Sequence, residues 1–129
     1  MSTTPETILD LAIELSKQPS ETAHRSSVSR AYYSGYHASI QYESSLPAVG
    51  REGGSGGTHK RLIDRLKSPD QACSAEQKRA SRKIGFVLAG LKNRRVDADY
   101  LLQMSGVDDV AARQAVADVA RLLAIVRSQ

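Results

Sequence analysis

The chain has 129 residues, of which 40% are hydrophobic and 25% are charged. This length is typical of one domain with its own core, and the composition excludes intrinsically disordered and membrane-embedded proteins. The single cysteine, Cys73, excludes an internal disulfide bond and a cysteine-based metal site.

Residues 1–6 contain no basic segment and no apolar run, so we expect no secretory signal. The longest apolar runs, such as residues 122–126, are far shorter than the roughly 20 residues that span a bilayer. We therefore expect a cytoplasmic protein that makes no contact with a membrane.

The formal net charge is +4, which permits binding to a polyanion without requiring it. The basic residues gather in two segments, one comprising Lys60, Arg61, Arg65 and Lys67 and the other Lys78, Arg79, Arg82, Lys83, Lys92, Arg94 and Arg95. A solvated helix face and a nucleic-acid contact both explain this clustering, and the sequence leaves both open.

The first half of the chain predicts two helices. Residues 6–17 have helical spacing of apolar side chains after Thr4 and Pro5, a typical helix start, and the pattern ends at Pro19. Ser20 caps a second predicted helix that runs to about Glu43. Its stripe of small and aromatic residues predicts a central position in the fold, because small residues allow close packing: Val28, Ala31, Tyr32, Gly35, Ser39 and Ile40.

Residues 45–57 are rich in glycine and predict a flexible loop. They lack the spacing of a phosphate-binding P-loop and follow no strand. A short helix is predicted from Thr58 to Leu66.

The second half predicts a long helix that begins at a capping box of Ser74 and Gln77. Its apolar pattern weakens at residues 93–95 and resumes at Val96. A connection around Gly106 leads to a last helix, from about Val110 to Arg127, with these residues inside: Val116, Val119, Ala120, Leu123 and Val126. The whole chain, residues 1–129, thus predicts one all-α domain, an antiparallel up-and-down bundle of four to five helices with a Gly-rich loop.

Three residues of the second helix are candidates for catalysis. Arg30 and His37 are seven residues apart, or about two helical turns, and Tyr33 lies between them on the same face. A guanidinium group binds phosphate in a bidentate manner, and an imidazole acts as an acid or base near neutral pH. A structural role inside the bundle or at an interface explains the same residues.

Three segments resemble the HEPN (higher eukaryotes and prokaryotes nucleotide-binding) family, in its small stand-alone subgroup. The first is Ser29 to Tyr33 followed by His37, the second is Thr58-His59 at the beginning of the short helix, and the third is Arg94 to Tyr100, which ends in Ala-Asp-Tyr. Their order and spacing agree with the family over roughly residues 20–126.

The resemblance implies a helical bundle that forms a homodimer and acts on or binds RNA or nucleotides. Many members of the family are metal-independent endoribonucleases of toxin–antitoxin, phage-defence or CRISPR-associated systems, so an antitoxin or another defence protein is the implied partner. In those enzymes Arg is followed after four to six residues by His. This sequence departs from the pattern, because Asp99 stands where the late-segment His is expected.

Three alternatives follow, of which the third is a plain structural or adaptor bundle, because a fold does not determine a function. In the first, Arg30, Tyr33 and His37 cleave RNA, while Lys60, Arg61, Arg94 and Arg95 bind it. In the second, the chain is a non-catalytic dimeric module that binds a nucleotide or a partner protein, and Arg95 and Asp99 form an ion pair. We expect no cofactor and no metal site, and we expect His24 to lie on the surface and His59 at a helix start that favours anions.

Overall fold

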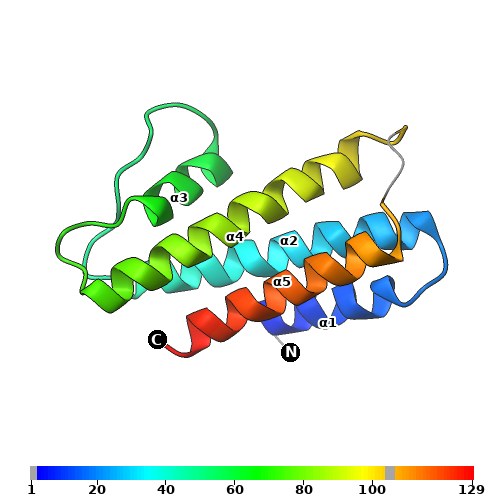
Figure 1. Cartoon of the computed structure of the whole chain (residues 1–129), viewed down its shortest axis with the longest axis horizontal. Helices are drawn as coiled ribbons and strands as arrows, with labels where there is room; N and C mark the ends of the chain where they lie inside the picture. The colour runs from blue at the N-terminus through cyan, green and yellow to red at the C-terminus, as the bar shows by residue number, and fades with distance from the viewer. Residues whose placement is uncertain (1–2, 104–106) are drawn as a thin grey trace.

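The computed structural model describes residues 3–103 and 107–129, and within these ranges it consists of five helices and no strand. Successive long helices run in opposite directions (Figure 1). The helices are α1 (Pro5–Ser16), α2 (Glu21–Ser44), α3 (Thr58–Lys67), α4 (Ala75–Tyr100) and α5 (Asp109–Arg127). The predicted all-α bundle is therefore confirmed. The predicted turn at Gly106 lies outside the described residues.

The predicted helix starts are confirmed by their caps. Thr4 and Thr7 form a reciprocal capping box at α1, and Ser74 and Gln77 form another at α4. The hydroxyl of Ser20 accepts a hydrogen bond from the backbone N–H of Ala23 at α2. Each bond satisfies a backbone donor that has no partner inside its helix.

Helix α2 packs against all four other helices, as its stripe of small residues predicts. Ser27 donates a hydrogen bond of 2.7 Å to the carbonyl of Ala12, and Ser34 donates one of 2.7 Å to the carbonyl of Pro5, so both hydroxyls join α2 to α1. The prediction for Ile40 is wrong, because this side chain is 38% exposed. Ser34 already contacts Pro5, the first residue of α1, and Ile40 lies further along α2. Helix α1 therefore does not cover Ile40.

Arg25 holds α2 against the end of α4. Its buried guanidinium donates hydrogen bonds to the carbonyls of Asp97 and Ala98 in the last turn of α4 and of Leu101, the C-cap residue of that helix. The prediction that the neighbouring His24 lies on the surface is wrong, since His24 is only 9% exposed. The start of α2 is inside the bundle because this contact draws it against α4.

The buried face of α5 differs from the predicted one by a rotation of the helix. Ala120 is exposed and Val116 is half-buried, whereas Val119, Leu123 and Val126 are buried as predicted. Three residues that the sequence did not single out complete this face: Ala112, Ala115 and Leu122. Of the described helices, none is long and apolar enough to cross a membrane.

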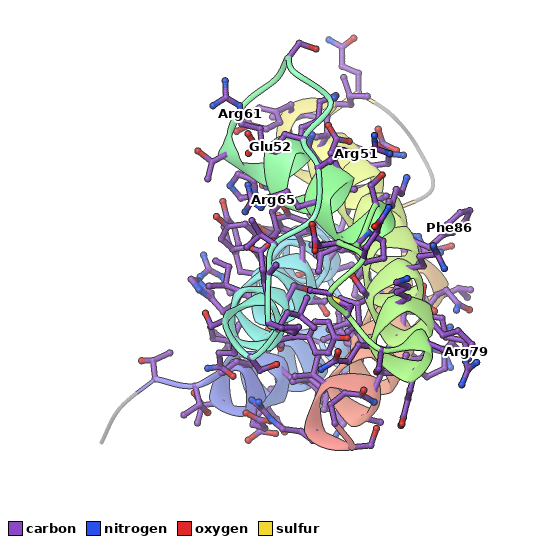
Figure 2. All side chains as sticks on the ribbon, turned by 90° about the vertical axis from the view of Figure 1, so that its left-hand side faces the viewer. Arg51, Glu52, Arg61, Arg65, Arg79 and Phe86 are labelled. Atoms are coloured by element: carbon purple, nitrogen blue, oxygen red, sulfur yellow. The ribbon has the colours of Figure 1, made fainter. Side chains whose placement is uncertain are left out.

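The glycine-rich loop is tied to α3 at several points. Arg65 forms ion pairs with Glu43 at the end of α2 and with Glu52 in the loop, at 2.8 and 2.7 Å (Figure 2). The backbone N–H of Gly53 donates a hydrogen bond of 3.3 Å to the carboxylate of Asp64. These contacts set the path by which the chain reaches His59.

Gly85 and Gly90 of α4 provide a test of how closely α3 packs. A methyl group at Gly85 would lie 3.0 Å from Cβ of Leu66 and 3.2 Å from the backbone nitrogen of Lys67, whereas one at Gly90 would meet nothing within 4 Å. We expect Gly90→Ala to stabilise the protein by up to about 1 kcal/mol through helix propensity. Gly85→Ala should destabilise it by roughly 1–3 kcal/mol, because α3 must move. Urea unfolding measures both, and equal stabilisation by the two substitutions would contradict the close packing.

Candidate functional site

Aromatic side chains of α2 meet a histidine of α3 on one side of the bundle. The ring of His59 stacks on Tyr36 with 4.2 Å between centroids, and its Nδ1 lies 2.5 Å from the hydroxyl oxygen of Tyr32. Tyr33 meets the edges of Tyr32 and His59, at 5.4 and 6.3 Å between centroids. We call Tyr32, Tyr33, Tyr36, His59 and Arg95 the tyrosine–histidine cluster.

Arg95 brings α4 into this cluster. Its guanidinium carbon lies 5.7 Å from the ring centre of Tyr32 and 5.3 Å from that of Tyr33, within the range of cation–π attraction. Its Nε lies 3.1 Å from the carboxylate of Asp99, which also accepts a hydrogen bond of 3.3 Å from Ser29. The predicted ion pair of Arg95 and Asp99 is thus present within α4, and the hydrogen bond from Ser29 to Asp99 links it to α2.

The hydroxyl of Tyr32 can support His59 in both of its protonation states. Burial raises the pKa of this phenol well above its ordinary value, so it stays protonated at neutral pH. A protonated hydroxyl donates to the unprotonated Nδ1 of one neutral tautomer, and it accepts a hydrogen bond from Nδ1–H of the other tautomer or of the imidazolium. Tyr32 therefore orients the imidazole without fixing its charge.

Of the three predicted catalytic residues, only Tyr33 belongs to the tyrosine–histidine cluster. Tyr33 belongs to the cluster, while His37 is exposed and packs its ring against Tyr36 with 5.3 Å between centroids. Arg30 is exposed one turn before Tyr33. No hydrogen bond or ion pair joins its side chain to another described residue. Arg30 and His37 thus lie at the solvent side of the cluster rather than inside it.

The four predicted nucleic-acid-binding residues do not form one surface. Arg94 forms an ion pair with Asp118 of α5 at 2.6 Å, whereas its neighbour Arg95 faces α2. Lys60 binds Asp64 at 2.8 Å, and Arg61 is exposed and donates a hydrogen bond of 3.0 Å to the carbonyl of Gly56 (Figure 2). Most of these charges are therefore engaged within the protein.

Sequence reasoning did not find the central contact between Tyr36 and His59. The Thr58-His59 pair in the segments that resemble HEPN proteins was the only signal for it, and it gave no partner for the ring. Asp99 was noticed as a departure from a pattern, while the structure shows it as an acceptor for both Arg95 and Ser29. Within residues 3–103 and 107–129, no group of three or more potential ligands could hold a metal ion.

No model of a protein family matches this chain, and neither a curated protein nor a solved structure matches it. The geometry of the tyrosine–histidine cluster therefore identifies it as the candidate functional site. That geometry brings together the three segments on which the resemblance to HEPN proteins was based, because α2, α3 and α4 each contribute to the tyrosine–histidine cluster.

The charges around His59 predict its titration. Burial lowers the pKa of His59 below its ordinary 6.5, and the nearby positive charges of Arg95 and Lys92 lower it further. We expect an NMR titration midpoint below 6.5, and Lys92→Gln should move it upward by removing one of these charges. Lys17→Gln, at the residue that caps the end of α1, is the control and should leave the midpoint unchanged.

The same shift predicts a dependence of stability on pH. The unfolded chain binds the proton of this histidine more readily than the folded chain does, so stability falls as the pH drops below about 6.5. His59→Gln should reduce this loss between pH 7.5 and 5.5 in urea unfolding. An NMR titration midpoint at or above 6.5 for His59 in the wild type would contradict the lowered pKa on which this prediction depends.

Proposed function

We propose that this chain binds RNA at the tyrosine–histidine cluster, as its resemblance to HEPN proteins implies. The observation that carries the proposal is the convergence of three separate segments on one aromatic and cationic group that reaches the surface. Tyr33 and Tyr36 are half-buried, so each side chain is held by its neighbours and still partly accessible to solvent. RNA-binding proteins stack unpaired bases on aromatic rings that neighbouring side chains hold in place.

The charges around the cluster suit a phosphate backbone. Arg30 and His37 are exposed beside it, and Lys92 lies close enough to lower the pKa of His59. Arg95 has a different role, because its charge is already paired with Asp99. It holds the rings of Tyr32 and Tyr33 in place, while the free cations at the edge meet phosphate groups.

RNA cleavage is a second candidate function, and the position of two histidines favours it. His37 and His59 both pack against Tyr36, and at neutral pH His59 is unprotonated and available as a base. His59 would take the proton of a ribose 2′-OH as that oxygen attacks the adjacent phosphate. His37 would donate a proton to the departing 5′ oxygen, leaving a 2′,3′-cyclic phosphate and a 5′-hydroxyl end without a metal ion.

Binding is tested with a fluorescein-labelled 12-nucleotide single-stranded RNA. Tyr36→Ala should weaken the affinity roughly 5- to 150-fold, the usual value of a lost base–aromatic stack, whereas Tyr36→Phe should retain it. Arg30→Ala should lower the slope of log affinity against log salt by about 0.7, the value of one phosphate contact. Arg113→Ala, an exposed arginine of α5, serves as the matched control. Equal affinity of Tyr36→Ala and the wild type would refute the proposed site.

Cleavage is tested with pooled RNA in the presence of EDTA. If the histidines act as base and acid, His59→Ala and His37→Ala should each lower the rate by about 10²- to 10⁴-fold. The products should carry 2′,3′-cyclic phosphate, and induction of the wild-type protein alone should arrest growth. Equal activity in both variants and the wild type would exclude catalysis by these residues and leave a non-catalytic RNA-binding module.

A further inference from the structure

Phe86 is the most exposed large hydrophobic side chain of the described residues. It lies in the middle of α4 and is 76% accessible to solvent. It adds nothing to the core, and its exposed ring has an unfavourable contact with water. The ring is therefore accessible to a ligand, and the charges around it indicate which kind.

The surroundings of Phe86 are cationic. The ammonium group of Lys67 lies 5.3 Å from the centre of the ring, and Arg82 and Lys83 precede Phe86 by one helical turn. Arg79 lies one turn earlier and projects from the same side of α4 as Phe86 (Figure 2). We call Lys67, Arg79, Arg82, Lys83 and Phe86 the Phe86 face.

These charges form no ion pair within the described residues. No acidic residue occurs between positions 77 and 96 of the sequence. Lys67 is partly compensated, because it lies close enough to Asp64 to lower the pKa of that carboxyl. Arg79, Arg82 and Lys83 thus present unpaired positive charge, unlike Arg94 and Arg95 on the same helix.

We propose that the Phe86 face binds single-stranded nucleic acid, with one base stacked on Phe86 and the neighbouring phosphates bound by the cations around it. Stacking on an exposed ring within a positive surface is how proteins hold single strands without reading their sequence. A protein partner would need a wider apolar area, because the core of a protein interface is depleted in charged residues. Here one ring stands among four cations.

This face is separate from the tyrosine–histidine cluster. Phe86 and Arg95 are nine residues apart on one continuous helix, so they point to opposite sides of α4. The inference therefore does not require the proposed function to be correct, and variants of the two surfaces can be tested independently.

The experiment measures the affinity of the full chain for fluorescein-labelled 12-nucleotide oligouridylate and oligothymidylate and for a 12-base-pair RNA duplex. Phe86→Ala should weaken binding to both single strands roughly 5- to 150-fold, because stacking does not use the 2′-OH. Phe86→Leu should weaken it similarly, while Phe86→Tyr should retain it. The duplex should show no dependence on Phe86, since its bases are already stacked.

Further variants separate this surface from the cluster. The effect of Phe86→Ala should persist in a Tyr36→Ala background, and each of Arg82→Ala and Lys83→Ala should lower the salt slope by about 0.7. Val110→Ala is the control, because Val110 is also an exposed apolar residue but lies on α5. If oligothymidylate alone depends on Phe86, the strand bound is DNA, and if oligouridylate alone depends on it, the strand is RNA.

Four results would overturn the proposal. The first is no binding of either single strand by the wild type, and the second is wild-type affinity in Phe86→Ala with an unchanged oligomeric state. The third is full affinity in Phe86→Leu, which would indicate an apolar contact without stacking. The fourth is a change of oligomeric state in Phe86→Ala with unchanged affinity, which would make this face a contact between copies of the chain.

Discussion

Tyr32 is completely buried, yet its hydroxyl group needs a hydrogen-bond partner inside the protein. Nδ1 of His59 supplies that partner, and the bond joins α3 to α2. The ring of the same tyrosine faces the guanidinium of Arg95, which joins α4 to α2. One buried residue thus brings three helices together, and the tyrosine–histidine cluster exists because each of them reaches Tyr32.

Charged residues in this protein serve two purposes, which their partners distinguish. Arg25 and Arg65 join helices to distant segments through carbonyls and carboxylates, whereas Arg95 pairs with Asp99 on its own helix and reaches α2 through the ring of Tyr32. Arg30, Arg82 and Lys83 are exposed and form no ion pair within the described residues. The paired group stabilises the fold, because a buried charge must be compensated. The unpaired group is available to a polyanion, and both proposed contacts depend on it.

The Gly-rich loop shows how a sequence signal and its role in the structure can differ. Its composition predicts a flexible connection, while Arg65 and Asp64 of α3 tie it back through Glu52 and Gly53. The glycines allow the chain to turn, and the ion pairs direct it toward the start of α3. The loop therefore contributes to the site by delivering His59.

The helices can be predicted from the sequence, because caps and apolar spacing are local: Thr4, Ser20 and Ser74 mark helix starts that the structure retains. The sequence also indicates the segments that form the cluster. The rotation of each helix and its contacts depend on packing between helices, so they are known from the folded structure alone. The buried face of the alanine-rich α5 could not be predicted from the sequence, because exposed Ala120 and buried Ala115 are the same residue type. Likewise, the burial of His24 and the contact of His59 with Tyr36 depend on docking between helices, which local spacing does not encode.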